Sequence, residues 1–128
     1  MIDSVVLDAW RFRDISQLAT VLTENATFSS PVADYRGRAN AAHVLGLIAT
    51  VLDSVEESAR WRDERDAVFA FTARAAGSEL HGMIREEHEA GGGLGHVTLY
   101  LRPYRALREA MAMMAERLRD SPLPESVG

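Results

Sequence analysis

The sequence contains no cysteine, which excludes a disulfide framework, a thiol nucleophile and a thiolate metal site. It also lacks an apolar run long enough to span a membrane, and its N-terminus shows no basic segment followed by an apolar one. It has no cluster of basic residues, and a net charge of −5 disfavours binding to nucleic acid or anionic lipid. We therefore expect a cytoplasmic protein with neither a nucleic-acid nor a membrane partner.

The remaining composition is that of one globular domain. Its 128 residues are 47% hydrophobic, which is enough for a sizeable core. The sequence shows no internal repeat and no linker. We expect a single domain over residues 1–120 and a frayed C-terminal tail over residues 121–128, where two prolines fall.

Residues 66–102 predict three consecutive antiparallel strands that share one apolar face. Every second residue is apolar from Ala67 to Ala75, and the same alternation recurs from Val97 to Leu101. Such alternation is typical of a strand with one face packed and the other exposed. Two-residue turns at 76–77 and 91–92 set the register. They predict the following pairs: Phe69 with Ile84, Phe71 with Gly82, Ile84 with Leu99, Gly82 with Leu101, Arg74 with Glu79, and Glu87 with His96.

Helical periodicity flanks this meander and supplies cover for its apolar face. Apolar residues recur at spacings of three and four over residues 2–13, 14–22 and 39–52, and Asp14 is expected to cap the second of these helices. A further helix follows Pro103. Its stripe, which we interpret as helix packing, consists of Leu107, Met111, Met114 and Leu118.

Two more strands are expected before the meander. Residues 26–30 form a short one that ends at Pro31. Residues 54–63 form another, in which Val55, Ala59 and Trp61 share one parity and are expected to face the core. Glu57 has the same parity, so it should also point inward.

The order of these elements resembles that of the nuclear transport factor 2-like superfamily, and in particular its SnoaL-like branch. The motifs that carry the resemblance are ENATFSSP at 24–31, YRGR at 35–38, LHG at 80–82 and LYLRP at 99–103. The resemblance implies an α+β fold in which a cone-shaped, curved antiparallel or mixed sheet wraps around three N-terminal helices, with a C-terminal helix added. It also implies an apolar pocket at the open end of the cone. Members include isomerases, cyclases, dehydratases and epoxide hydrolases, so the fold alone does not determine the function.

The chain departs from the ketosteroid isomerase-like members at their functional positions. Those members carry a catalytic aspartate directly before the proline of the first strand, and Ser30 stands there in this sequence. Their tyrosine donor on the first helix falls near Val6, and their second acid falls at Ile84 or Glu86. The resemblance therefore does not carry the usual isomerase base to this chain.

Three titratable residues are candidates for proton transfer. The predicted register turns Glu86 and His88 inward on one strand face, and Glu57 faces inward from the strand before the meander. Burial in an apolar pocket raises the pKa of a carboxylate, which fits it for general acid or base catalysis near neutral pH. The alternative is that this strand end projects beyond the cone and leaves these groups solvated. Every grouping of histidine and carboxylate lacks a third ligand, so we expect no metal and no other cofactor.

The inner residues and those at the cone mouth could line a pocket for a small apolar ligand. The candidates are Trp10, Phe28, Ser30, Tyr35, Phe69, Phe71, Ile84 and Leu99. The alternative is that the aromatic residues fill the core. Phe71 opposite Gly82 favours some room there, although an aromatic ring often folds over a facing glycine.

The outer face of the meander has the mixed aromatic, methionine, arginine and short polar composition that protein interfaces favour. Its members are Thr72, His81, Met83, Arg85, Thr98, Tyr100 and Arg102. We expect a homodimer through this face.

For the function itself, the sequence leaves two hypotheses. The first is a SnoaL-like protein that binds a small apolar ligand in the cone pocket. The alternative is a pocket enzyme of isomerase, cyclase, dehydratase or hydrolase type, with Glu86 and His88 as its acid and base.

Overall fold

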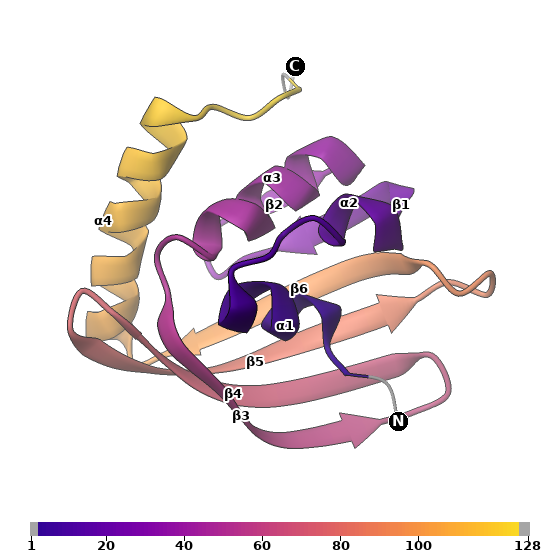
Figure 1. The fold of residues 1–128 in the computed structure, drawn as a ribbon, viewed down its shortest axis with the longest axis horizontal. Coiled ribbons are helices and arrows are strands. Elements are labelled where there is room, and N and C mark those ends of the chain that lie inside the picture. The colour runs from indigo at the N-terminus through magenta and orange to yellow at the C-terminus, as the bar shows by residue number, and fades with distance from the viewer. Residues whose placement is uncertain (1–2, 126–128) are drawn as a thin grey trace.

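One curved sheet of six strands forms the body of the molecule, which a computed structural model describes over residues 3–125 (Figure 1). The strand order is β2-β1-β6-β5-β4-β3, and all neighbours are antiparallel except the parallel pair β1 and β6. The elements are α1 (Val5–Phe12), α2 (Leu18–Val21), β1 (Leu22–Ser29), β2 (Asp34–Arg36), α3 (Arg38–Ile48), β3 (Asp53–Arg62), β4 (Asp66–Ala75), β5 (Ser78–His88), β6 (Leu94–Arg102) and α4 (Tyr104–Asp120).

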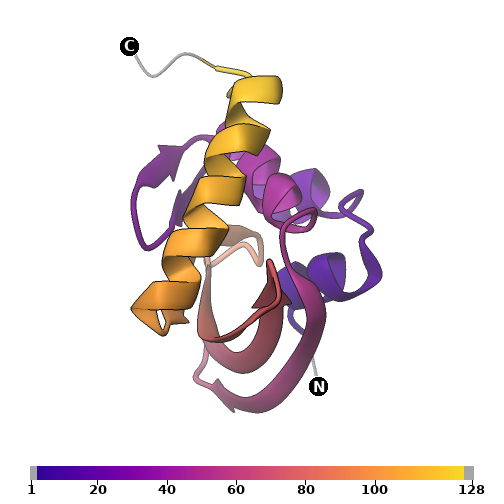
Figure 2. The ribbon, with the colours of Figure 1, turned by 90° about the vertical axis from the view of Figure 1, so that its left-hand side faces the viewer.

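The helices cover the concave side of this sheet. Helices α1, α2 and α3 lie over the sheet in Figure 1, and Figure 2 shows α4 crossing one end of the curve, alongside α3. This arrangement confirms the predicted α+β cone with three N-terminal helices and a C-terminal helix. Among the described residues, none of the helices has the length and apolar character that crossing a membrane requires.

The predicted register of the meander is confirmed. Phe69 pairs with Ile84, and Ile84 pairs with Leu99, so the same residues of β5 face inward in both ladders. All three are buried, whereas Tyr100 is 56% exposed on the other face. Because side chains alternate along a strand, the two predicted turns were enough to assign the inner positions of β5 as far as Glu86. A register shift between Glu87 and His88 removes His88 from the pairing that turned it inward.

The ring of Phe71 fills the space opposite Gly82. A Cβ atom added at Gly82 would lie 2.5 Å from Cζ of Phe71, so the ring lies directly over the glycine backbone. Trp10 meets Phe71 edge-on, with ring centroids 5.8 Å apart. Phe71 and Trp10 therefore fill the core, and the space opposite Gly82 is not open to a ligand.

The N-terminal helices begin later than their periodicity predicts. Helix α1 begins at Val5, with the Ser4 hydroxyl accepting a hydrogen bond from the Leu7 N–H as N-cap, and Ile2 lies outside the described residues. Helix α2 begins only at Leu18, so the expectation that Asp14 caps it is wrong. Asp14 instead accepts hydrogen bonds from the backbone and hydroxyl of Ser16 within the turn before α2. Helix α3 ends at Ile48, and its expected last residues lie in turns.

Strand β3 contains a bulge that reverses the predicted orientation of its second half. Glu57 pairs with Phe71, but the next pair is Ala59 with Ala70, so Ser58 is an extra residue. Glu57 faces inward as predicted. Beyond the bulge the parity changes: Trp61 is 54% exposed, and Arg60 pairs with the inward-facing Phe69. The expectation that Ala59 and Trp61 face the core is therefore wrong.

The first part of the C-terminal tail is held against α3, which differs from the frayed tail expected over 121–128. The Asn40 side chain donates to the Glu125 carbonyl at 3.3 Å and accepts from the Glu125 N–H at 3.1 Å. Nε2 of His43 lies 2.7 Å from the Ser121 carbonyl oxygen. Polar side chains of α3 thus satisfy the backbone of this segment. Residues 126–128 lie outside the described residues.

Candidate functional site

An apolar cavity of about 270 Å³ lies between α3, α4, β6 and the loop that joins β1 to β2. Its walls come mainly from aliphatic and methionine side chains. The walls include Ile48 of α3, Leu99 and Leu101 of β6, and Leu107, Met114 and Leu118 of α4. Among the described residues that line the cavity, two have polar side chains, Ser30 and Tyr35. We call this space the α4 cavity.

The Ser30 hydroxyl is already used by its own turn. Its oxygen accepts hydrogen bonds from the N–H groups of Val32 at 3.2 Å and Ala33 at 3.1 Å, and it donates to the Ala33 carbonyl at 3.0 Å. This pattern is a serine turn that closes the loop between β1 and β2. Ser30 therefore shapes the wall of the cavity and has little capacity left for a ligand.

Tyr35 is the other polar wall residue. It lies on β2 opposite Phe28 of β1, and the two rings are stacked with centroids 6.0 Å apart and an interplanar angle of 17°. Among the described residues, no hydrogen bond engages its hydroxyl. Partial burial raises the pKa of the phenol, so it stays protonated at neutral pH.

The structure separates the residues predicted for a pocket into two groups. Ser30, Tyr35 and Leu99 line the α4 cavity. The other five do not line it but are buried in the core under α1 and α3: Trp10, Phe28, Phe69, Phe71 and Ile84. These five residues fill the core because α1 packs Trp10 against Phe71 of the sheet. The indole N–H of Trp10 also donates to the Leu45 carbonyl at 2.9 Å.

Sequence reasoning missed the wall that α4 provides. The stripe of Leu107, Met111, Met114 and Leu118 was interpreted as helix packing, and it does face the molecule, but what it faces is a cavity. A methionine-rich stripe is a weak signal for such a wall, since methionine adapts to irregular space. Figure 2 shows α4 crossing the end of the sheet, and the side chains of α3, α4 and β6 leave a cavity there.

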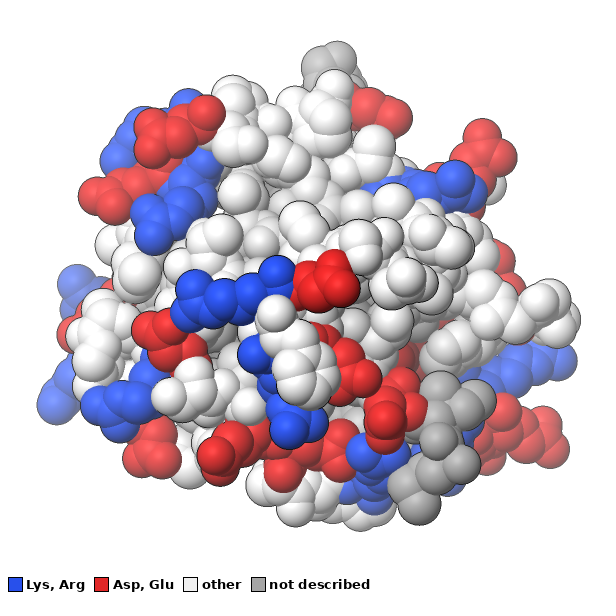
Figure 3. Space-filling view, in the orientation of Figure 1, with Lys and Arg blue, Asp and Glu red and all other residues white. Residues whose placement is uncertain are grey.

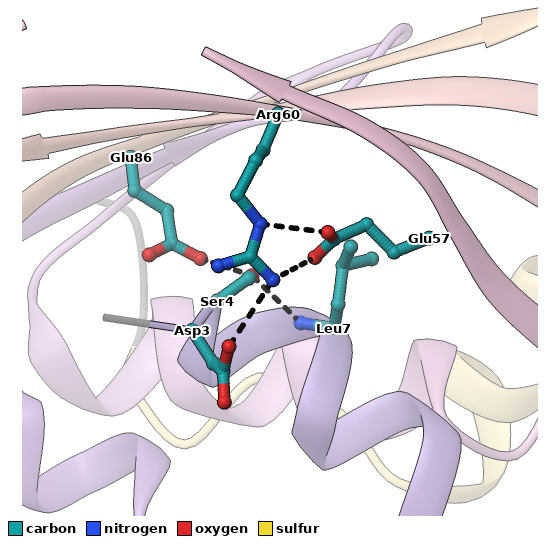
Figure 4. A network of polar contacts seen from close by, with 6 residues as sticks. All are labelled: Asp3, Ser4, Leu7, Glu57, Arg60 and Glu86. Atoms are coloured by element: carbon teal, nitrogen blue, oxygen red, sulfur yellow. Dashed lines mark hydrogen bonds and ion pairs between the residues drawn. The ribbon is translucent and has the colours of Figure 1, made fainter. Parts of the chain in front are cut away.

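A second group of residues lies between the sheet and the N-terminal end of α1 (Figure 4). We call it the polar cluster, and it consists of Asp3, Ser4, Glu57, Arg60 and Glu86. Glu86 of β5 is 3% exposed, and its Oε2 accepts a hydrogen bond from the Ser4 hydroxyl at 2.5 Å. The Val6 N–H points to the same oxygen at 3.5 Å. Burial raises the pKa of Glu86, and these two hydrogen bonds act in the opposite direction. A buried carboxyl group thus anchors the first turn of α1.

Arg60 carries the positive charge of the polar cluster. Its guanidinium binds Glu57 through Nε at 2.8 Å and Nη2 at 2.9 Å, and Asp3 through Nη2 at 3.1 Å. The hydrogen bonds to Glu57 and Asp3 raise the pKa of Arg60 above its ordinary value. Its guanidinium also lies 5.4 Å from the centre of the Phe69 ring. Figure 3 shows charged side chains gathered at the lower edge of this face, where β3 runs.

The three residues proposed for proton transfer do not form one site. Glu57 is bound to Arg60 and Glu86 to Ser4, whereas His88 lies past a register shift at the end of β5. The ring Nδ1 of His88 is 3.1 Å from the Arg65 carbonyl oxygen. Among the described residues, no hydrogen bond links these three side chains, and none of them lines the α4 cavity. Glu86 thus belongs neither to an acid–base pair in a pocket nor to a solvated strand end, because it is buried outside the cavity.

The predicted dimer face is open to solvent over much of its area. His81, Met83, Tyr100 and Arg102 are exposed, and the other predicted members, Thr72, Arg85 and Thr98, are half-buried. The bulge in β3 adds Trp61, which sequence reasoning placed in the core. Trp61, Met83 and Tyr100 line one shallow hollow on this face. Arg85 at its edge forms an ion pair with Asp66 at 3.0 Å.

Within the described part of the chain, no group of three or more histidine, aspartate or glutamate side chains is arranged to hold a metal ion.

Comparison with known proteins supports the fold. The sequence matches no family model and no curated protein. Among solved structures, the chain is similar to a steroid delta-isomerase from Pseudomonas aeruginosa, with 26% identity, coverage of 88% of this chain and 85% of that one, and a TM-score of 0.84. It is also similar to an uncharacterised protein with a cystatin-like fold from Silicibacter pomeroyi, with 21% identity, coverage of 91% and 82%, and a TM-score of 0.83.

A more distant similarity points to ring-forming chemistry in another protein. The epoxide hydrolase/cyclase-like enzyme SalBIII, which acts in pyran ring formation in the polyether salinomycin, shares 14% identity with this chain. The match covers 77% of this chain and 86% of that one, with a TM-score of 0.64. At this identity the similarity concerns the fold alone.

Proposed function

Because the chain has the nuclear transport factor 2-like fold, and its structural neighbours agree with the SnoaL-like branch, we propose that it binds a small, uncharged, largely apolar molecule in the α4 cavity. The observation that carries the proposal is the composition of the wall. Apart from the phenol of Tyr35, no titratable side chain is among the described residues that line the cavity. An apolar ligand would lose little hydration on entering, whereas a charged one would find no partner.

The size of the cavity supports a ligand of about two rings. An apolar cavity of roughly 150 Å³ is known to hold benzene, and this one measures about 270 Å³. The name of one similar protein, a steroid delta-isomerase, refers to a largely apolar substrate class, which agrees with an apolar occupant here.

The alternative of a pocket enzyme using Glu86 and His88 has less support. Acid–base catalysis requires the group to reach the reacting atom directly or through one water. Glu86 is engaged by Ser4 under α1, and the wall of the cavity does not include it. The contacts of Glu86 are those of a residue that holds a helix in place.

Binding can be tested by titrating the protein with tetralin, a two-ring hydrocarbon, and recording amide shifts by NMR. We expect saturable shifts in α4, β6 and the end of α3. Ala110 is a buried wall residue of α4, so Ala110→Phe should fill the cavity and weaken binding by more than tenfold. Ala112→Phe, at an exposed position of the same helix, is the matched control and should bind as the wild type does.

Two outcomes would contradict the proposal. One is the absence of saturable shifts in the wild type. The other is equal binding by Ala110→Phe and Ala112→Phe when circular dichroism shows that both are folded, because that would place tetralin outside the α4 cavity.

We also propose that two copies of the chain associate through the outer face of the sheet. Trp61, Met83 and Tyr100 are 54%, 42% and 56% exposed, and all three line the same hollow. Clustered exposed aromatic and methionine side chains are typical of interface centres. The flanking pair of Arg85 and Asp66 would form part of the polar rim.

Sedimentation velocity tests the association. We expect the wild type to sediment with about twice the chain mass of 14.1 kDa, and Tyr100→Glu to sediment with that of one chain. Tyr104→Glu is the matched control, because Tyr104 is 70% exposed at the start of α4 and does not line the hollow. A monomeric wild type, or a Tyr100→Glu variant that remains dimeric, would contradict the proposal.

A further inference from the structure

Among the described residues that line the α4 cavity, Tyr35 has a polar side chain to which no other described residue hydrogen-bonds. We infer that the ligand carries a single uncharged oxygen acceptor, a carbonyl, hydroxyl or ether, and that this oxygen accepts a hydrogen bond from the Tyr35 hydroxyl. The inference rests on the proposed function and adds the chemical class of the ligand and the residue that selects it.

Ser30 and Tyr35 are the polar wall residues that could form a hydrogen bond to a ligand. The Ser30 hydroxyl donates to Ala33 and accepts from two N–H groups of its turn, so its donor is occupied. No hydrogen bond engages the Tyr35 hydroxyl within residues 3–125. The Tyr35 side chain is half-buried, so its hydroxyl can hydrogen-bond to water until a ligand takes that place. The free donor of the wall is therefore Tyr35.

Contacts with Phe28 fix the orientation of the Tyr35 ring. Its residue lies in β2 and pairs with Phe28, and its ring stacks on that of Phe28. Phe28 itself is fully buried, so the stacked ring rests on a fixed surface. A donor held in one orientation loses little rotamer freedom when a ligand binds, which favours selectivity for an acceptor placed opposite it. The raised pKa of the phenol keeps the donor proton in place at neutral pH.

The cavity wall offers no charged partner to an anionic ligand among the described residues. The wall contains no arginine or histidine among the described residues, so a carboxylate or phosphate would enter without a counterion. Burial of an unpaired charge is far more costly than burial of a neutral oxygen that has a hydrogen bond. The site therefore favours neutral oxygenated molecules of roughly ten to twelve heavy atoms, by comparison with the benzene-sized cavity above.

The experiment compares three ligands of one shape by calorimetry or by the NMR titration described above. Tetralin has no oxygen, 1-tetralone adds one carbonyl, and 1,2,3,4-tetrahydro-1-naphthoate adds a negative charge. We expect the wild type to bind 1-tetralone about three- to tenfold more tightly than tetralin, as a single net hydrogen bond predicts. The carboxylate should bind most weakly.

Tyr35→Phe removes only the hydroxyl and keeps the stacked ring. It should bind tetralin as the wild type does, and bind 1-tetralone no better than tetralin. If the wild type binds tetralin but shows no preference for 1-tetralone, or if Tyr35→Phe keeps the preference, this inference fails while the proposed function stands. If neither compound binds, both fail. The wild-type ratio needs no variant, so the inference remains testable even if Tyr35→Phe does not fold.

Discussion

The two ends of the sheet's inner face are completed in opposite ways. At the end crossed by α4, the apolar side chains of β6 and α4 leave about 270 Å³ unfilled. At the end covered by the first turn of α1, Glu86, Arg60 and their partners fill the space with paired polar groups. Strand β6 supplies the sheet side of the first end, whereas β5 and β3 supply that of the second. A different set of strand residues and a different covering helix thus separate a region suited to binding from one suited to holding the fold.

If the polar cluster holds the fold, removing Glu86 should have the largest effect. Glu86→Ala leaves the buried Ser4 hydroxyl without its partner and creates a void, so we expect a loss of about 2–4 kcal/mol in the free energy of unfolding. Denaturant unfolding measures it. Glu86→Gln keeps an acceptor for Ser4 and should lose much less. Wild-type stability in Glu86→Ala would remove the distinction between the two ends.

The next effect is a pH dependence that belongs to the same carboxyl group. Burial raises the pKa of folded Glu86 above its ordinary 4.5, while the nearby His88 lowers it and Asp8 raises it. The folded state then binds the proton more tightly than the unfolded state, so ionisation destabilises it. The contribution is complete below the unfolded pKa and is lost as the pH rises through the folded pKa.

This pH dependence is measured against a variant that cannot ionise. The free energy of unfolding of the wild type, relative to Glu86→Gln, should fall as the pH rises from about 4.5, because contributions of other groups cancel in the difference. A difference that stays constant, or rises with pH, would mean that the hydrogen bonds from Ser4 and Val6 outweigh burial.

A smaller effect is expected at Arg60. Arg60→Leu leaves Glu57 and Asp3 without their shared cation, in a site where the Arg60 side chain is only 24% exposed. We expect a loss of unfolding free energy that is smaller than that of Glu86→Ala, because solvent screens the ion pairs of a partly exposed guanidinium. The control is Arg65→Leu at an exposed turn position, which should change stability by less than about 0.5 kcal/mol. Equal effects of both substitutions would count against a structural role for the cluster.

The smallest effect is expected at the cavity. Met114 is a partly buried wall residue of α4, so Met114→Ala enlarges a space that is already unfilled and should cost less than about 1 kcal/mol. Met113 is also partly buried on α4 but does not line the cavity. We expect Met114→Ala to cost no more than Met113→Ala in thermal unfolding. A clearly larger cost at Met114 would mean that the cavity wall is packed as tightly as the core.

Much of the fold could be predicted from the sequence because the meander has strict alternation and short turns. Phe69, Ile84 and Leu99 fall on one face in the register that the two turns predict, and the structure places them there. The inward position of Glu57 and the burial of Glu86 follow from the same alternation. Local sequence is sufficient where the physics is local.

The parts that failed depend on contacts between distant segments. No local signal marks Ser58 as an extra residue, so the orientation of Arg60 could not be predicted. Trp10 was expected to line a pocket because it is large and apolar, but the position of α1 over the sheet makes it core. The cavity depends on where α4 crosses the sheet, and helical periodicity indicates that a helix is amphipathic without indicating what it covers.

The extra residue in β3 also affects how this chain should be aligned with others. Against a relative whose strand is regular, an alignment without a gap at Ser58 would equate Arg60 with a solvent-facing position and Trp61 with an interior one. Deletion of the Ser58 codon would leave Arg60 opposite Phe69, because the ladder on both sides of the gap keeps its pairs. Deletion of Ser58 would thus remove the bulge without exchanging the faces that the cation and the indole occupy, so a correct alignment places a one-residue gap opposite Ser58.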